Sequence, residues 1–203
     1  MGESNESIGA APRSVCLFCG SRCGDRPIYA ALAARVGERL ADLGIGLVTG
    51  GGRVGLMGAV ADAALARGGR VVGVIPEALM LREVAHDSLS ELHVVANMHQ
   101  RKSLMARRAD AFLTLPGGVG TYEEFFELLS WAFLGIHEKP LGVLNVEGYF
   151  DPLLAMLRHG QAEGFIHKSL DDLIVVSDDV REVIEGLVAR MPRAAAVNDF
   201  SGT

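Results

Sequence analysis

Lysine is scarce in this chain of 203 residues, and no hydrophobic stretch is long. Only Lys102, Lys139 and Lys168 provide a side-chain amine, so chemistry that depends on a lysine Schiff base has few candidates. No stretch approaches the roughly 18 continuous apolar residues of a membrane-spanning helix. The polar segment 1–13 lacks the apolar core of a secretory signal, and we therefore expect a cytoplasmic protein without membrane attachment.

Cysteine is equally rare, but Cys16, Cys19 and Cys23 lie close together. That spacing raises the possibility of a metal site. Cys16 and Cys19 fall in an apolar run typical of a buried strand, where residues an odd number apart point to opposite faces. A zinc site also needs a fourth ligand, and none is near in the sequence. We expect reduced thiols and no metal.

The charge balance, 19 basic against 25 acidic residues, gives a net charge of −6, which argues against a nucleic-acid partner. Apolar residues make up 49% of the chain and charged residues 22%, a composition that excludes extensive disorder. The length favours one domain. We assign it to residues 14–190, with loose tails at 1–13 and 191–203.

Short apolar runs alternate with helical stretches along the whole domain. The predicted strands are 15–19, 46–49, 70–75, 92–96, 111–115, 141–144 and 173–176. The predicted helices are 27–43, 55–67, 98–108, 121–134, 151–163 and 179–189. Apolar strands that alternate with helices predict an α/β, Rossmann-like doubly wound fold, with a mainly parallel sheet of about seven strands and helices on both faces. A closed eight-fold barrel is the alternative, but it usually takes about 250 residues. In a doubly wound fold the ligand site lies beyond the carboxyl ends of the strands.

Two glycine-rich loops follow predicted strands, at residues 50–58 (GGGRVGLMG) and 116–124 (PGGVGTYEE). Glycines let backbone N–H groups approach a ligand, and the following helix directs its positive end there, so a phosphate fits best. Each loop alone is equally explained as a tight turn. Gly50, Gly52 and Gly55 also match a dinucleotide-binding spacing, with Glu77 as the ribose carboxylate, which keeps a nicotinamide-dependent oxidoreductase as an alternative.

Two cations, Arg101 and Lys102, share the inward face predicted for helix 98–108. A buried cation needs a carboxylate or a bound anion as partner. Glu124 has two interpretations. It completes a T-x-x-E capping box with Thr121, or it borders the buried face of its helix as a catalytic carboxylate beside the phosphate loop.

These motifs resemble those of one family. Residues 116–124 match the P-G-G-x-G-T-x-x-E motif of the LOG (Lonely Guy) family of cytokinin riboside 5′-monophosphate phosphoribohydrolases, a family long labelled as lysine decarboxylases. Residues 98–105 (MHQRKSLM) resemble its second motif, M-H-x-R-K-x-x-M, and Cys19-Gly20-Ser21 and Gly50-Gly51-Gly52 stand where the family has them. The resemblance spans about residues 15–188.

The resemblance implies hydrolysis of the N-glycosidic bond of AMP or an N6-substituted (prenyl) AMP, with release of the base and ribose 5-phosphate. By analogy Arg101 and Glu124 form the catalytic pair. The implied substrate-binding residues are Gly20, Ser21, Gly51, Gly52, Glu83, Lys102, Gly117, Gly118, Val119, Gly120, Thr121, Tyr122, Glu123 and Ser130.

The resemblance further implies a homodimer with the active site near the interface, to which Met98, Met105 and Phe125 contribute apolar surface. No metal or redox cofactor is implied. A decarboxylase that uses pyridoxal phosphate needs a Schiff-base lysine, and only Lys102 lies near a motif. A nucleotide-binding sensor, in which Glu124 acts only as a helix cap, is the second alternative beside the oxidoreductase.

Overall fold

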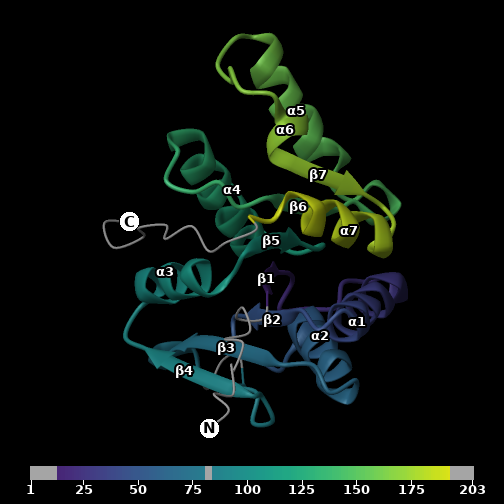
Figure 1. Cartoon of the computed structure of the whole chain (residues 1–203), viewed down its shortest axis with the longest axis vertical. Helices are drawn as coiled ribbons and strands as arrows, with labels where there is room; N and C mark the ends of the chain where they lie inside the picture. The colour runs from purple at the N-terminus through teal and green to yellow at the C-terminus, as the bar shows by residue number, and fades with distance from the viewer. Residues whose placement is uncertain (1–12, 81–83, 193–203) are drawn as a thin grey trace, which may run out of the picture.

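Seven strands form one parallel sheet in the computed structural model, which describes residues 13–80 and 84–192 (Figure 1). The strands are β1 (Ser14–Phe18), β2 (Gly46–Thr49), β3 (Val71–Pro76), β4 (Glu91–Val95), β5 (Ala111–Thr114), β6 (Leu141–Leu144) and β7 (Ile174–Ser177). Their order is β4-β3-β2-β1-β5-β6-β7, and each neighbouring pair is parallel. The predicted doubly wound α/β fold is confirmed.

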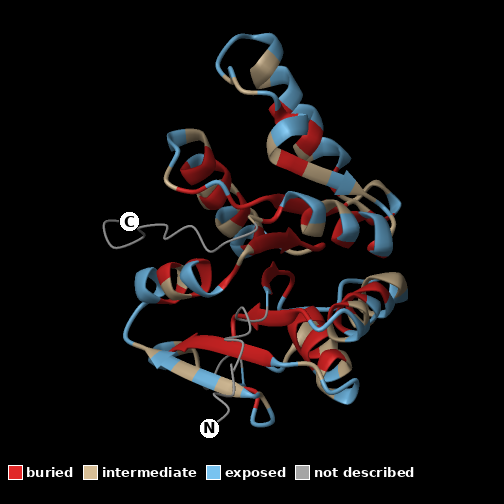
Figure 2. Ribbon diagram, in the orientation of Figure 1, coloured by how far each residue is buried: buried red, intermediate tan, exposed pale blue. Residues whose placement is uncertain are grey.

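Helices cover both faces of the sheet. They are α1 (Pro27–Asp42), α2 (Gly55–Ala66), α3 (Met98–Arg108), α4 (Val119–Leu134), α5 (Asp151–Ala162), α6 (Leu170–Leu173) and α7 (Val180–Arg190), with short 3-10 helices η1 (Glu77–Leu79) and η2 (Val146–Gly148). Buried residues of α1, α2 and α7 form one apolar core. Those of α3, α4 and α5 form a second core on the other face. The five inner strands, β1, β2, β3, β5 and β6, are buried throughout, whereas the edge strands β4 and β7 are mostly half-buried or exposed (Figure 2).

The order in which strands are added to the sheet reverses at β1, which pairs with β2 on one side and β5 on the other. From β1 the strands proceed outward to β4, and the chain then returns to β5 and continues to β7. The loops after β1 and β5 therefore diverge to opposite faces and open a crevice between them at the carboxyl edge. The loop after β5 is the glycine-rich loop 116–124, and the loop after β1 begins with the Cys19-Gly20-Ser21 motif.

Of the two interpretations of Glu124, the capping box with Thr121 is wrong. Helix α4 begins at Val119, its N-cap is Gly118, and no side chain caps it. Thr121 lies inside the helix with 3% of its surface exposed. A Cβ on Gly117 would clash with its hydroxyl, so Thr121 packs against the preceding loop instead of closing the helix end.

Some short elements were not predicted, among them α6, η1 and η2, because they span less than the two turns that a periodic pattern needs. Predicted tails 1–13 and 191–203 lie almost entirely outside the described residues, as does Glu83. In the described ranges, no helix is both long and apolar enough to cross a membrane.

Candidate active site at the carboxyl edge of the sheet

A cavity of about 270 Å³ opens at this edge, between α3 and the start of α4. It brings together residues from distant segments: Cys19, Gly20, Ser21, Met57, Leu79, Met98, Arg101, Gly118, Val119, Gly120, Thr121, Glu123 and Glu124. Both expected catalytic residues and much of the expected substrate-binding set thus line one cavity.

Arg101 reaches the cavity from α3, a helix capped by Asn97, whose side-chain oxygen accepts the Gln100 N–H at 2.9 Å. Only 4% of Arg101 is exposed. Its Nη2 donates to the Gly50 carbonyl oxygen at 3.0 Å. A Cβ on Gly50 would clash with that nitrogen, so the first glycine of the earlier loop provides the space for the guanidinium. The charge is thereby held at a defined place beside the cavity.

Glu124 reaches the same cavity from α4, and its negative charge acts on two buried thiols, Cys16 and Cys19. Burial raises the pKa of Cys19 well above its ordinary value, and the negative charge of Glu124 raises it further. Burial and Glu124 likewise raise the pKa of Cys16, while the positive charge of Arg101 lowers it. Arg101 and Glu124 therefore act on a common region.

Those two thiols lie in different cores, Cys16 in the α3–α5 core and Cys19 in the α1–α2 core, as the alternation of a strand requires. The expectation of opposite faces is confirmed. In the described part of the chain, no three His, Cys, Asp or Glu side chains are grouped closely enough to hold a metal ion.

The amino end of α4 is suited to an anion. Without a side-chain cap, its first backbone N–H groups are available to a ligand and carry the positive end of the helix dipole. A Cβ added to Gly118 or Gly120 would meet nothing within 4 Å, so both glycines face open space in the cavity. The resulting surface of backbone amides fits a phosphate group.

Lys102 points toward α4 and is not among the residues that line this cavity. Its Nζ lies 2.6 Å from a Glu123 carboxylate oxygen and 2.8 Å from one of Glu127. Burial lowers the pKa of Lys102, but the hydrogen bonds and charges of both carboxylates outweigh it and raise the pKa overall. Lys102 is therefore paired with two carboxylates of the neighbouring helix α4, as expected for a cation on the inward face of α3.

The earlier glycine loop, residues 50–58, packs against neighbouring backbone segments next to the site. Gly51 accepts the His86 N–H at 2.9 Å, and Gly52 forms an isolated β-bridge with Ala85. Gly55, with a positive φ of 62°, lets its backbone approach the Ser21–Arg22 peptide. Gly51 and Gly52 do not line the cavity, and Ser130 is exposed further along α4.

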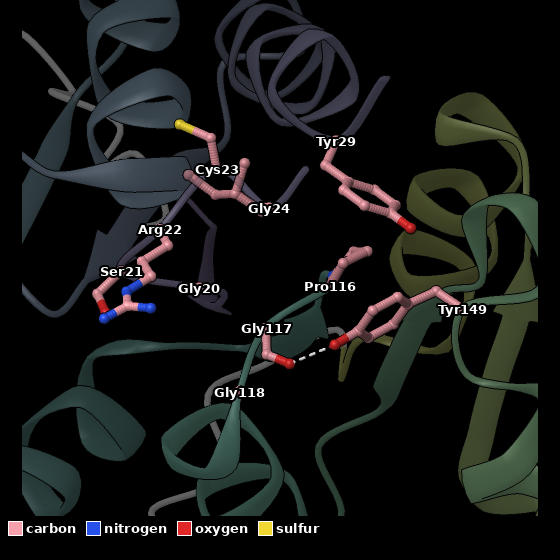
Figure 3. A pocket seen from close by; sticks show the side chains of 11 residues that line it. Gly20, Ser21, Arg22, Cys23, Gly24, Tyr29, Pro116, Gly117, Gly118 and Tyr149 are labelled. Atoms are coloured by element: carbon pink, nitrogen blue, oxygen red, sulfur yellow. Dashed lines mark hydrogen bonds between the residues drawn. The ribbon is translucent and has the colours of Figure 1, made fainter. Parts of the chain in front are cut away.

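A second cavity of about 370 Å³ adjoins the first and shares Gly20, Ser21 and Gly118 with it. Figure 3 shows the rings of Tyr29 and Tyr149 on one side of this space, with the loop that follows β1 on the other. Sequence reasoning missed both tyrosines because no local pattern links them to the motifs.

Glu127 and the apolar wall of Met57 and Leu79 were also missed. The helical spacing of Glu123 and Glu127, four residues apart on one face, was the available signal for the Lys102 partners. Met57 and Leu79 belong to segments that only the folded sheet brings beside α3 and α4.

Comparison with known proteins shows which family the chain belongs to. The family model described as "Possible lysine decarboxylase" matches residues 57–187. The cytokinin riboside 5′-monophosphate phosphoribohydrolase of Rhodococcoides fascians is 51% identical over 179 residues, covering 88% of each chain. The probable phosphoribohydrolase LOGL1 of Oryza sativa subsp. japonica is 47% identical over 190 residues, covering 91% of this chain and 85% of the relative.

Solved structures support the fold. The molybdenum cofactor binding protein of Rippkaea orientalis superposes with a TM-score of 0.67 at 19% identity, over 88% of this chain and 97% of its own. At that identity the likeness concerns the fold alone. The sequence relatives, which are far more similar, carry the assignment: the chain belongs to the LOG family, together with these cytokinin riboside 5′-monophosphate phosphoribohydrolases.

Proposed function

We propose that the protein hydrolyses the N-glycosidic bond of AMP or an N6-substituted AMP and releases the free base and ribose 5-phosphate. The observation that carries this proposal is the single cavity that holds Arg101, Glu124 and the uncapped amino end of α4. The names of the relatives support the same reaction. A nicotinamide-dependent oxidoreductase would use the earlier glycine loop, but that loop packs against protein backbone.

In the proposed reaction the bond between C1′ of the ribose and the base nitrogen breaks, and a water oxygen bonds to C1′. One water proton goes to the departing base, and the other stays on the oxygen, which becomes the C1′ hydroxyl of ribose 5-phosphate. Positive charge develops on the ribose as the bond breaks. The Glu124 carboxylate stabilises that charge and orients the water.

Phosphate binding is assigned to the first amides of α4, next to Gly118 and Gly120, with Ser21 on the opposite wall. This contact uses a part of the substrate that does not react to hold C1′ near Glu124. Arg101 adds a buried positive charge that balances the phosphate and the carboxylate. Because Arg101 is fixed by Gly50, its charge is in place before the substrate arrives.

The deciding experiment incubates the protein separately with AMP, isopentenyladenosine monophosphate and NADH, and detects free base by chromatography. We expect base from the monophosphates. Glu124→Gln should lower kcat about 100- to 10,000-fold, as the loss of a general acid–base group does, and Arg101→Ala should lower kcat/KM strongly. Thermal melting checks that both variants fold.

Glu163→Gln is the matched control, since Glu163 is an exposed carboxylate at the end of α5, remote from the cavity. Binding of AMP without turnover would replace the hydrolase with a nucleotide sensor. Oxidation of NADH would favour the oxidoreductase. Wild-type turnover in Glu124→Gln would remove Glu124 from the mechanism.

We also infer that the protein is a homodimer with the cavity near the interface. Of the three residues expected to provide apolar surface, the structure buries Met105 and Phe125 in the core, each 1% exposed, while Met98 is 42% exposed. Val119, also at the cavity, is 83% exposed. Exposed apolar side chains around a binding site support a protein contact there.

A further inference from the structure

Two tyrosines form a hydrogen-bonded chain that ends on the glycine loop between β5 and α4. The Tyr149 hydroxyl donates to the Gly117 carbonyl oxygen at 2.5 Å, across 32 residues of sequence (Figure 3). The hydroxyl oxygens of Tyr122 and Tyr149 are 2.9 Å apart. Because a carbonyl only accepts, the Tyr149 proton lies toward Gly117, and Tyr122 is the donor to Tyr149. The chain therefore has one direction, from Tyr122 through Tyr149 to Gly117.

The position of Tyr149 is set by its surroundings. Its ring packs edge-on against Tyr29, with centroids 5.7 Å apart, and against Phe150 at 4.9 Å. The side chain of Asn145 accepts the Phe150 N–H at 2.7 Å and closes the turn from which Tyr149 projects. Burial and the neighbouring Tyr122 raise the pKa of Tyr149 to about 12, so its hydroxyl keeps the proton near neutral pH.

The bond acts on the peptide unit that joins Gly117 to Gly118. Glycines stand on both sides of the Gly117–Gly118 peptide, so its rotation is less restricted than that of other peptide units. In a trans peptide the C=O and N–H point in opposite directions. Holding the Gly117 carbonyl toward Tyr149 therefore directs the Gly118 N–H away from Tyr149. Gly118 is the N-cap of α4 and lines the catalytic cavity.

We propose that Tyr149 is a positioning residue that fixes the Gly117–Gly118 peptide, so that the start of α4 presents its amides to the 5′-phosphate of the substrate. This assignment rests on the proposed function, because the proposed substrate carries the phosphate that the loop would bind. Tyr149 does not touch the reacting atoms. It affects affinity for the phosphate-bearing part of the substrate and leaves the affinity for the base unchanged.

Tyr149→Phe tests the assignment because it removes the hydroxyl and keeps the ring against Tyr29 and Phe150. The KM for AMP and the inhibition constant of ribose 5-phosphate should both rise about 3- to 10-fold, the effect of losing one hydrogen bond. kcat and the inhibition constant of adenine should stay within about 2-fold. A purely structural defect would not separate the two products in this way.

Tyr29→Phe is the matched control, since it removes a neighbouring hydroxyl and leaves the chain to Gly117 intact; its constants should equal those of wild type. Tyr122→Phe removes the donor to Tyr149 and should raise the ribose 5-phosphate constant by a smaller factor. It also provides the test if Tyr149→Phe does not fold. Unchanged ribose 5-phosphate constants in both chain variants, or equal increases for adenine, would overturn the assignment.

The result can be separated from the outcome for the proposed function. If wild type releases no base, calorimetry still compares the affinity of wild type for ribose 5-phosphate with that of Tyr149→Phe. Weaker binding to the variant supports the positioning role without any hydrolysis. If wild type releases base and the variant binds ribose 5-phosphate equally well, the hydrolase stands and the role of Tyr149 fails.

Discussion

Each of the chain's three lysines stabilises a helix that carries an expected catalytic residue. Lys139 donates from Nζ to the Ala106 carbonyl at 2.8 Å, near the end of α3. Lys168 donates to the carbonyls of Ala132 and Phe133, near the end of α4. These carbonyls form the negative ends of the helices, where a cation is favourable. Lys102 completes the set by joining the two helices through ion pairs.

Such roles leave the lysines poorly suited to Schiff-base chemistry. A nucleophilic amine must lose its proton, yet the carboxylates around Lys102 raise its pKa. Burial does lower the pKa of Lys139. That residue precedes β6, however, at the amino edge of the sheet, opposite the glycine loops. The decarboxylase label of the family is therefore not supported by the lysines of this member.

At the same scale, His137 predicts a pH dependence of stability. Burial lowers the pKa of His137 from its usual 6.5 to about 4. Its Nε2 donates to the Leu128 carbonyl at 3.0 Å, and its Nδ1 accepts the Lys139 N–H at 3.1 Å, a pattern that requires the neutral ring. Between pH 4 and 6.5 the unfolded chain binds the proton and the folded one does not. Stability from this residue is therefore present above pH 6.5 and is lost as the pH falls toward 4.

Urea unfolding at several pH values measures this effect. We expect His137 to remove about 3 kcal/mol from the free energy of unfolding across that interval, and a His137→Gln variant to show a correspondingly smaller slope. An exposed histidine provides the control, since His159→Gln on α5 should keep the wild-type slope. Equal slopes in wild type and His137→Gln would contradict the prediction.

Among the elements, the amino end of α4 has a sequence that favours ligand binding over helix stability. Gly120 occupies a helical position where alanine is more stable by roughly 0.5–1 kcal/mol. Its missing Cβ faces open space in the cavity. Gly120 thus lowers helix stability, and no protein atom lies close enough to exclude a larger side chain. We explain it by a ligand that occupies this space.

Gly120→Ala should therefore raise the melting temperature slightly and raise the KM for AMP at least about 10-fold, because the new methyl group occupies the phosphate site. Gly160→Ala in α5 is the helical control for KM: its new methyl group would contact Ile166, which does not line the cavity, and the KM should stay unchanged. Thermal melting and steady-state kinetics measure both. An unchanged KM in Gly120→Ala would place the phosphate elsewhere.

The helices and strands show which parts of the fold could be predicted from sequence patterns. All seven strands were predicted within about two residues, because buried parallel strands have unbroken apolar runs. The start of α4 was misplaced because Thr121 and Glu124 fit a local cap pattern, whereas the contact between Thr121 and Gly117 depends on the folded loop. Tyr149 was not predictable, since its contact with Gly117 exists only because β6 lies beside β5.

For the whole molecule, a net charge of −6 is compatible with an anionic substrate because the positive charge is local. Arg101 is buried at the cavity, and the amino end of α4 adds the partial charge of its dipole. Several other cations lie in exposed pairs such as Arg26 with Glu147 and Arg181 with Glu185, where they contribute little to a field. One small anion can bind, while an extended polyanion meets a negatively charged surface.

The proposed dimer provides the prediction at this scale. Met98 and Val119 are exposed apolar residues at the cavity, and Val94, 50% exposed on the edge strand β4, lies shortly before Met98 in the chain. Sedimentation should give twice the chain mass of 21.6 kDa. Met98→Glu should shift the protein toward monomer, because a buried unpaired carboxylate opposes association. Met156→Glu, on the distant helix α5 and 55% exposed, should leave the dimer intact. Wild-type protein that sediments as a monomer and still releases base would show that one chain forms the complete site.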